Sequence, residues 1–307
     1  MTYKVGIVGY GVVGKKRHAA IKKIPDFKVV ALSDKSFKGA KESQDFVRYS
    51  DFKDLINLEE IDVLFISLPN KFASEATLMA LNKDIHVFCE KPPAKSLLEL
   101  FPIKEKVEGS NLKLMYGFNH RYHLSASKAK QIIDEKSLGK VINLKGSYGK
   151  SKMISFNQTD WRTDRQKSGG GILLDQGIHM LDLMNYYAGG FSKIFSIIKN
   201  NFWNFDVEDN AFVLMENDNG VVAQLHSSAT QWKHTFKLEI TLERGSLLLE
   251  GILTSSKSYG SERLKIIYSD PDNDRGDPQE EVLHFEEDVS WDLEVLTFAD
   301  AIRNSAN

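Results

Sequence analysis

The chain has 307 residues, enough for about two domains of ordinary size. Its composition, 42% hydrophobic and 27% charged, is typical of a globular protein with a large core. The formal net charge of -2 argues against nucleic acid or an anionic membrane as a general partner. The single cysteine, Cys89, excludes an internal disulfide, and no apolar run reaches the roughly 18 residues of a membrane-spanning helix. Since the first residues also lack a signal-peptide pattern, we expect a cytoplasmic protein.

Residues 1–122 alternate between short apolar runs and segments with helical periodicity. This alternation is typical of βαβ units and a parallel sheet, and it predicts an α/β domain of the nucleotide-binding type. The predicted strands are Tyr3–Val8, Lys28–Leu32, Val63–Leu68, His86–Phe88 and Lys113–Tyr116. The predicted helices between them are Val12–Lys23, Phe72–Asn82 and Leu97–Val107.

Residues 123–307 have a different pattern, in which a few helices precede a run of strands. The predicted helices are Ser125–Glu135 and Leu173–Tyr187, separated by a strand at Val141–Tyr148 and a polar loop. Turn residues at Asn217–Gly220 and Glu243–Gly245 predict hairpins, hence an antiparallel sheet. Its predicted strands are Lys193–Asn200, Ala211–Glu216, Val221–Ala229, Phe236–Glu243, Ser246–Leu249 and Leu264–Tyr268. We expect a second, α+β domain here.

A glycine-rich loop, Gly9-Tyr10-Gly11-Val12-Val13-Gly14, follows the first predicted strand and opens the first predicted helix. In dinucleotide-binding loops, the first glycine makes a tight turn, the second lets a pyrophosphate approach the backbone, and the third allows close helix–strand packing. The helix N-terminus then offers unpaired N–H groups to the phosphates. Because the loop follows a predicted strand and precedes a predicted helix, the glycine pattern is specific for dinucleotide binding, which we predict.

Asp34 stands twenty residues after Gly14, at the end of the second predicted strand. A carboxylate there accepts hydrogen bonds from an adenosine ribose and repels a 2′-phosphate, which favours NAD over NADP. The neighbouring Lys35 could offset that repulsion, so NADP stays open. The alternative for Asp34 is a plain helix N-cap.

Two further motifs resemble those of a known protein family. Glu90-Lys91-Pro92 follows the strand at His86–Phe88, and the run from Gly169-Gly170-Gly171 to Asp175, His179 and Asp182 opens the second-domain helix. Together with the glycine loop, these motifs resemble the Gfo/Idh/MocA family of sugar and polyol oxidoreductases over nearly the whole chain. The resemblance implies an α/β Rossmann domain (1–122) plus an α+β domain with an open, mainly antiparallel sheet (123–307). It also implies oligomerisation through that sheet, and hydride transfer between a sugar-like alcohol and a nicotinamide.

Lys91 is the first candidate catalytic residue. It lies at the carboxyl end of a parallel strand, the edge at which open α/β sheets bind ligands. An ammonium group there can stabilise the charge of a forming alkoxide. The alternative is a surface lysine paired with Glu90, and the Lys91–Pro92 bond could be cis.

Asp175 and His179 are the other candidate catalytic residues. On a helix, their spacing of four places them on one face, and we expect Leu174, Ile178 and Leu181 to anchor an adjoining face in the core. Histidine suits a general base because its pKa lies near neutrality. The alternatives are a satisfied core histidine, or a metal site that includes Asp182; hydride transfer to a nicotinamide needs no metal, and we expect none.

Softer candidates lie near these motifs. Ser67–Asn70 resembles the family's loop on the nicotinamide side, although Ala73 replaces the usual histidine, and Asn119–Tyr122 resembles its Asn-x-Arg-aromatic segment. For Arg121, a structural ion pair is an equal alternative to a substrate role. The predicted cofactor-binding residues are Gly9, Tyr10, Gly11, Val12, Val13, Gly14, Asp34, Lys35, Leu68, Pro69, Asn70, Glu90, Lys91 and Asn119. The predicted substrate-binding residues are Lys91, Arg121, Trp161, Arg162, Asp175 and His179.

We therefore predict an NAD-dependent dehydrogenase of a sugar-type hydroxyl group that works as a homodimer or homotetramer. The basic segment Asn157–Lys167 (Arg162, Arg165, Lys167 with Trp161) favours an anionic or nucleotide-linked sugar. The alternative for this segment is a solvated loop that does not contact the substrate, which would then be myo-inositol or a free aldose. The alternative for the whole protein is a non-catalytic nicotinamide-binding regulator. Family members usually continue beyond the position of Asn307, so we expect that this chain is short or truncated.

Overall fold

A computed structural model describes residues 2–37, 45–153, 161–254, 256–272 and 276–304. The chain forms two compact units, each with its own sheet. The first unit comprises Met1–Phe118, Gln166–Gly169 and Trp291–Asn307, and the second comprises Asn119–Arg165 and Gly170–Ser290.

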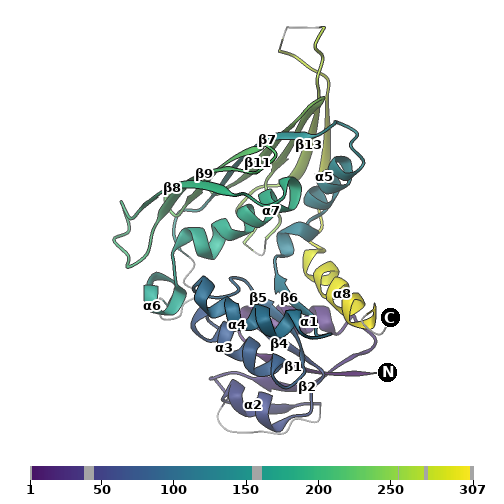
Figure 1. The fold of residues 1–307 in the computed structure, drawn as a ribbon, viewed down its shortest axis with the longest axis vertical. Coiled ribbons are helices and arrows are strands. Elements are labelled where there is room, and N and C mark those ends of the chain that lie inside the picture. Colours follow the sequence, from purple (N-terminus) through teal and green to yellow (C-terminus); the bar gives the residue numbers. More distant parts are fainter. Residues whose placement is uncertain (1, 38–44, 154–160, 255, 273–275, 305–307) are drawn as a thin grey trace. The chain divides into compact units, whose positions relative to one another are not determined.

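The sheet of the first unit has six parallel strands in the order β3-β2-β1-β4-β5-β6 (Figure 1). The order reverses direction at β1 and β4, which creates the switch point where ligands bind in open α/β sheets. The predicted strands are all present, but β3 was not predicted, because three residues are too few to show a pattern. The strands are β1 (Tyr3–Val8), β2 (Phe27–Ser33), β3 (Val47–Tyr49), β4 (Val63–Ile66), β5 (His86–Glu90) and β6 (Leu114–Gly117).

Two separate apolar clusters cover the faces of this sheet. Successive residues of β1 divide between them: Ile7 belongs to the cluster formed with α1 (Val12–Ile21) and α8 (Ser290–Arg303), and Val8 belongs to the other. The second cluster is formed with α2, α3 and α4, of which α2 was not predicted. These helices are α2 (Phe52–Leu58), α3 (Asn70–Leu81) and α4 (Leu97–Glu108).

The C-terminal helix departs from the expected domain boundaries. We assigned all of 123–307 to the second domain, but contacts place Trp291–Asn307 with the first unit and end its main segment at Phe118. The reason is aromatic packing: the ring of Phe298 in α8 lies 5.8 Å from that of Phe65 in β4 and 5.5 Å from that of Phe88 in β5. The helix thus completes a core that the first 118 residues leave open.

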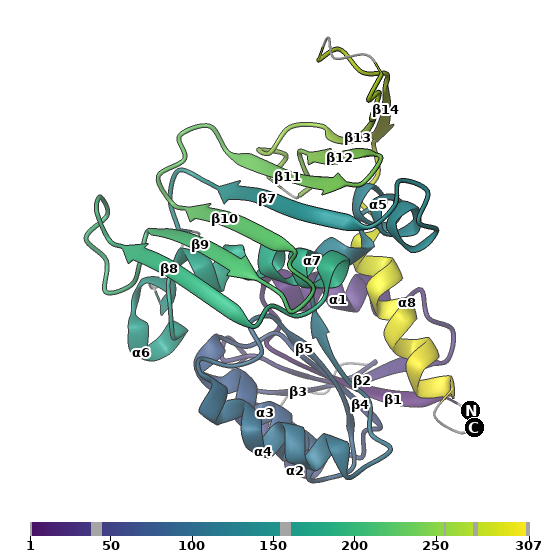
Figure 2. The ribbon, with the colours of Figure 1, turned by 45° about the horizontal axis from the view of Figure 1, so that its top comes forward.

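The sheet of the second unit has eight strands in the order β14-β13-β12-β11-β7-β10-β9-β8 (Figure 2). Its neighbouring strands are antiparallel except for the parallel pair β7 and β10. The predicted hairpins are present, whereas β14 was not predicted. The strands are β7 (Val141–Gly149), β8 (Lys193–Lys199), β9 (Asn210–Glu216), β10 (Val222–Ser228), β11 (Thr235–Leu242), β12 (Gly245–Glu250), β13 (Glu262–Tyr268) and β14 (Glu280–Phe285).

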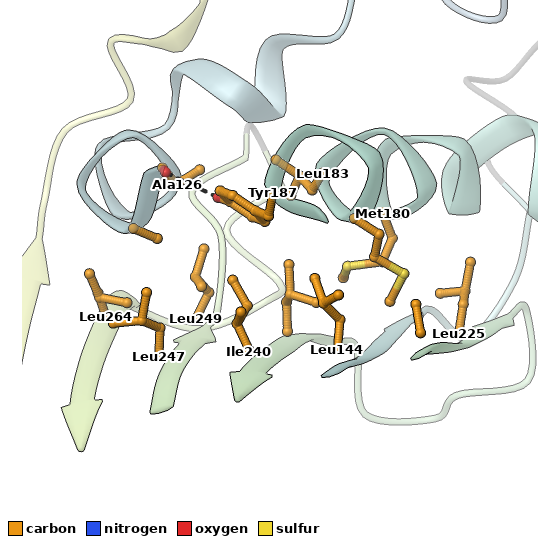
Figure 3. Close-up of a cluster of buried hydrophobic side chains, with 14 of the residues drawn as sticks. Ala126, Leu144, Met180, Leu183, Tyr187, Leu225, Ile240, Leu247, Leu249 and Leu264 are labelled. Atoms are coloured by element: carbon orange, nitrogen blue, oxygen red, sulfur yellow. Dashed lines mark hydrogen bonds between the residues drawn. The ribbon is translucent and has the colours of Figure 1, made fainter. Parts of the chain in front are cut away.

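Helices α5 (Leu124–Asp134) and α7 (Ile178–Ala188) cover one face of this sheet (Figures 2 and 3). The side chain of Tyr187 crosses between them, and its hydroxyl donates to the carbonyl of Ala126 (3.0 Å). We expected Leu174, Ile178 and Leu181 to anchor this segment, but they are only partly buried. The anchors are instead Met180, Leu183, Met184 and Tyr187. The remaining short elements are η1 (Asn119–Tyr122), η2 (Trp161–Thr163), α6 (Arg165–Ser168) and η3 (Leu173–Gly177).

Candidate active site

The glycine loop joins β1 to α1 at the switch point of the first unit. Gly9 has a φ of +84°, and a Cβ there would lie 2.3 Å from the carbonyl oxygen of Ser67. A Cβ on Gly14 would lie 2.0 Å from the carbonyl oxygen of Gly9. At Gly11, by contrast, a Cβ would meet nothing within 4 Å. The fold itself therefore requires the outer glycines, whereas Gly11 opens onto space that a pyrophosphate would fill.

Asp34, at the end of β2, fastens this loop. Its Oδ2 accepts the backbone N–H of Tyr10 (2.8 Å), and its Oδ1 accepts the N–H (2.9 Å) and the hydroxyl (2.7 Å) of Ser36. The adjacent Lys35 places its ammonium 5.0 Å from the ring centre of Phe72. Asp34 thus holds the glycine loop, while Val12 and Val13 begin α1 as predicted.

The loop after β4 carries Leu68, Pro69 and Asn70. Pro69 immediately precedes α3, and Asn70 is buried, with its Nδ2 donating to the carbonyl of Ser168 (2.8 Å). Ala73 is buried in the core cluster of this face. The side-chain amide of Asn70 is therefore used within the first unit.

Glu90 ends β5, and Lys91 follows it directly. Oε1 of Glu90 accepts Nε–H of Arg17 in α1 (2.6 Å), and Arg17 also contacts Glu294 of α8 (2.7 Å). Arg17 is fully buried between the rings of Phe88 and Trp291. The Lys91–Pro92 peptide bond is cis, and the Lys91 side chain is half-buried. Arg17 belongs to the basic run Lys15-Lys16-Arg17, a pattern that is typical of a solvated helix face, so its burial could not be predicted from the sequence.

Asp175 and His179 lie on a helix that changes its winding between them. Asp175 belongs to η3, a stretch of π-helix, and His179 belongs to α7. The expected α-helical spacing of four is thus interrupted by a π-turn, a distortion that is frequent at functional sites. His179 is buried, and Asp175 is partly buried.

Two cations flank Asp175. The buried ammonium of Lys150 lies 3.5 Å from its Oδ2, and Nε–H of Arg162 donates to its Oδ1 (3.2 Å). The Arg162 guanidinium lies 4.3 Å from the ring centre of Trp161. Sequence reasoning missed Lys150, whose one signal is its position just after the end of β7. Of the predicted basic segment, residues 157–160 lie outside the described residues, and Arg165 bonds to Asp206.

Glu208, another residue that sequence reasoning missed, holds the start of this helix. Its carboxylate accepts the N–H groups of Gly171 (2.8 Å) and Leu173 (3.1 Å). A Cβ on Gly171 would lie 2.0 Å from the carbonyl oxygen of Glu208. This contact explains why a glycine stands two residues before the π-helical stretch Leu173–Gly177 that carries Asp175.

Arg121 forms a bidentate pair with Asp182, at 2.7 Å from Nε and 2.5 Å from Nη2. Burial raises the pKa of Asp182, against the opposing effect of the Arg121 guanidinium. The ion-pair alternative for Arg121 is thus present in the structure, and Asp182 is committed to it. Among the described residues, no cluster of three His, Cys, Asp or Glu side chains could hold a metal ion.

The side-chain amide of Asn119, a predicted cofactor ligand, is engaged inside the second unit. Its Nδ2 donates to the hydroxyl of Ser290 (3.0 Å), and its Oδ1 lies 3.2 Å from Nδ1 of His120. Of the predicted site residues, the cofactor set except Asn119 belongs to the first unit, and the substrate set except Lys91 belongs to the second. In the described part of the chain, the helices are all too short or too polar to cross a membrane.

Comparison with known proteins gives matches over both units. Residues 3–118 match the family model described as "Oxidoreductase family, NAD-binding Rossmann fold", and residues 126–248 match the "GFO/IDH/MocA C-terminal domain". The two matched ranges together span most of the chain.

Among curated proteins, the chain is 31% identical to glucose-6-phosphate 3-dehydrogenase of Bacillus subtilis over 188 residues, which is 60% of this chain and 53% of that protein. It is 27% identical to levoglucosan dehydrogenase of Pseudarthrobacter phenanthrenivorans over 208 residues, 63% of this chain and 53% of that protein. These alignments thus span about half the length of the curated relatives.

Solved structures show the same fold at lower identity. Levoglucosan dehydrogenase in complex with NADH superposes with a TM-score of 0.84 at 19% identity, covering 99% of this chain and 91% of that one. Myo-inositol 2-dehydrogenase from Lactobacillus plantarum gives a TM-score of 0.76 at 21% identity, covering 99% and 90%. The expected architecture, a parallel Rossmann sheet followed by a mainly antiparallel one, is confirmed.

Proposed function

Because the chain belongs to the Gfo/Idh/MocA family of oxidoreductases, we propose that it is an NAD-dependent dehydrogenase of a sugar-type hydroxyl group. The observation that carries this proposal is the loop at the switch point, where Gly11 alone of the three glycines opens onto empty space. Named relatives, glucose-6-phosphate 3-dehydrogenase and levoglucosan dehydrogenase, support a sugar as the substrate class.

The residues of the first unit fit a nicotinamide dinucleotide. Gly9–Gly14 would hold the pyrophosphate against the N-terminus of α1, and Asp34, already oriented by the loop, would accept from the adenosine ribose. Leu68, Pro69 and Lys91 follow β4 and β5, whose carboxyl ends lie at the same edge of the sheet as that of β1. When bound, NAD accepts a hydride from the carbon that bears the reacting hydroxyl. We favour NAD over NADP because of the carboxylate of Asp34.

Three residues would act on the sugar. We assign the general base to His179, which takes the hydroxyl proton on a ring nitrogen as the C–H bond breaks. Lys91 would hydrogen-bond the same oxygen, and its ammonium would stabilise the negative charge that forms there. Asp175, which lies between the cations Lys150 and Arg162, would orient the sugar.

An anionic sugar is our finer proposal for the substrate. The similarity to a glucose-6-phosphate 3-dehydrogenase favours it. The pairing of the Arg162 guanidinium with the Asp175 carboxylate weighs against it, and the Arg165 guanidinium already donates to the backbone carbonyl of Asp206 (3.2 Å). A phosphorylated sugar therefore ranks above a nucleotide-linked one here, and a neutral sugar such as a free aldose or myo-inositol is the alternative.

A steady-state assay of NADH formation over a sugar panel tests the function. Glucose 6-phosphate, glucose, myo-inositol and UDP-glucose would be compared with the native protein and with Lys91→Met and His179→Asn. We expect Lys91→Met to lower kcat by several orders of magnitude and His179→Asn by roughly 10²–10⁴-fold, with NAD affinity retained in both.

Three outcomes would contradict this proposal in part or as a whole. Near-normal turnover in both variants would remove their assigned roles. If glucose or myo-inositol is oxidised while glucose 6-phosphate and UDP-glucose are not, the proposal of an anionic substrate is refuted. A protein that binds NAD but oxidises none of the panel would support the non-catalytic regulator instead.

We also propose a cytoplasmic homodimer or homotetramer that assembles through the sheet of the second unit. Apolar side chains are exposed on the face of β8 and β9 that lies opposite α7. Phe195 is 65% exposed, and Phe212 and Leu214 are about half exposed, whereas their neighbours in β9, Val213 and Met215, are buried in the core. A second copy of the chain would cover this face.

A further inference from the structure

Two histidine rings are stacked face to face in the second unit. The ring centroids of His120 and His179 are 3.8 Å apart, their planes are inclined by 14°, and both side chains are buried. We propose that His120 is a positioning residue for His179: it fixes the plane of that ring and offers it an uncharged face. The inference rests on the proposed role of His179 as the general base.

A chain of hydrogen bonds fixes which nitrogen of His120 carries hydrogen. The hydroxyl of Ser290 donates to Oδ1 of Asp288 (2.6 Å) and accepts Nδ2–H of Asn119 (3.0 Å). Since the amide nitrogen of Asn119 is used there, its Oδ1 faces Nδ1 of His120 at 3.2 Å. An amide oxygen only accepts, so Nδ1 of His120 must be the donor.

The other nitrogen of His120 meets a tyrosine. Its Nε2 lies 3.1 Å from the hydroxyl of Tyr148, and burial raises the pKa of Tyr148 well above the ordinary value. Tyr148 therefore keeps its proton and can donate it to Nε2. We infer this direction, in which Nδ1 donates, Nε2 accepts and His120 is a neutral imidazole in one tautomer.

A neutral, immobile ring is a suitable neighbour for a general base. When His179 takes a proton, its positive charge faces the π-system of His120, an attractive cation–π arrangement. A protonated His120 at the same distance would repel that charge instead. The ring centroids of His123 and Phe236 lie 5.5 Å and 5.8 Å from that of His120, so the His120 ring cannot rotate freely.

Several of the other charges around α7 are arranged in pairs. Asp182 pairs with Arg121, Asp175 with Lys150 and Arg162, and Lys130 with Asp134. Lys145 and His226 alternate with the core residues Leu144 and Leu225, and so lie on the opposite face of the sheet. Replacing His120 leaves these pairs in place. The titratable residues of α7 and of the elements packed against it are His120, Arg121, Tyr122, Lys128, Lys130, Asp134, Lys145, Tyr148, Asp175, His179, Asp182, Tyr186, Tyr187 and His226.

The test compares His120→Leu, which removes the ring, with His120→Phe, which keeps a flat uncharged ring. For His120→Leu we expect kcat to fall on the order of 10- to 100-fold, because the ring of the base, His179, is no longer held in one orientation. NAD affinity should be unchanged. The acidic limb of the kcat/KM pH profile should move to lower pH, because protonated His179 loses the π-face. His120→Phe should retain most of the turnover and the position of the limb. Thermal unfolding checks that both variants fold.

A double variant separates this inference from the proposed function. In a His179→Asn background, His120→Leu should cause no further loss, because it acts through His179. An equal loss in both backgrounds, wild-type kinetics in His120→Leu, or a limb that moves to higher pH would each overturn the inference and leave the role of His179 intact. Full activity of His179→Asn alone would refute the proposed base itself.

Discussion

At the scale of single residues, the three glycines of the first loop are needed for different reasons. Gly9 and Gly14 are required by close contacts within the protein, and only Gly11 opens onto space. We therefore expect Gly11→Val to abolish NAD binding, since the isopropyl group would occupy the pyrophosphate position, while the chain still folds. Isothermal titration with NAD, together with circular dichroism, measures both. Gly109→Ala, whose Cβ would make an ordinary 3.6 Å contact, is the matched control. Retained NAD affinity in Gly11→Val would contradict the assignment.

Single residues also mark the limit of prediction from the sequence. The motifs identified the residue types in order, but not their partners: Arg121 pairs with Asp182 and Arg162 with Asp175. Such pairs depend on which distant segments the fold brings together, and Arg121 is 61 residues away in sequence from its partner Asp182. Asn119 is a predicted cofactor ligand, and its amide bonds to Ser290 and His120, contacts that a spacing argument could not reveal.

At the scale of elements, one buried cation adds to the aromatic packing of Phe298 in holding α8 against α1 and β5. Arg17 of α1 lies between Glu90 and Glu294 and between two aromatic rings. We expect Arg17→Met to destabilise the protein by about 3–5 kcal/mol, because it leaves two carboxylates without their buried partner. Urea unfolding measures the loss. Lys15→Met on the exposed side of the same helix is the control, and equal stability of the two variants would contradict this role.

The elements themselves were largely predictable, and the exceptions have physical causes. Long periodic segments such as α3 and α7 follow the apolar pattern. The π-turn at Leu173–Gly177 does not, because it arises from Glu208 holding the N–H groups of Gly171 and Leu173 from 35 or more residues away. The location of α8 was also missed, since its amphipathic pattern fits any open apolar surface.

At the scale of the whole molecule, we propose that the exposed apolar face of β8 and β9 forms the interface of the assembly. We expect Phe195→Asp to shift the protein to monomers, because a carboxylate would be buried in the interface that we propose. Light scattering coupled to gel filtration measures the mass. Leu58→Asp, at a similarly exposed leucine of α2 (71%), should leave the assembly unchanged. A wild-type protein that is already monomeric would refute the proposal.

Hydride transfer from a sugar carbon to NAD is tested most directly by isotope transfer. Carbon-deuterated glucose 6-phosphate and carbon-deuterated glucose would each be incubated with NAD and the protein, and the NADH formed would be weighed by mass spectrometry. The account predicts NADH one mass unit heavier than that formed from the unlabelled sugar, with Lys91→Met forming almost none. NADH without deuterium, or no NADH from either sugar with NAD bound, would contradict it.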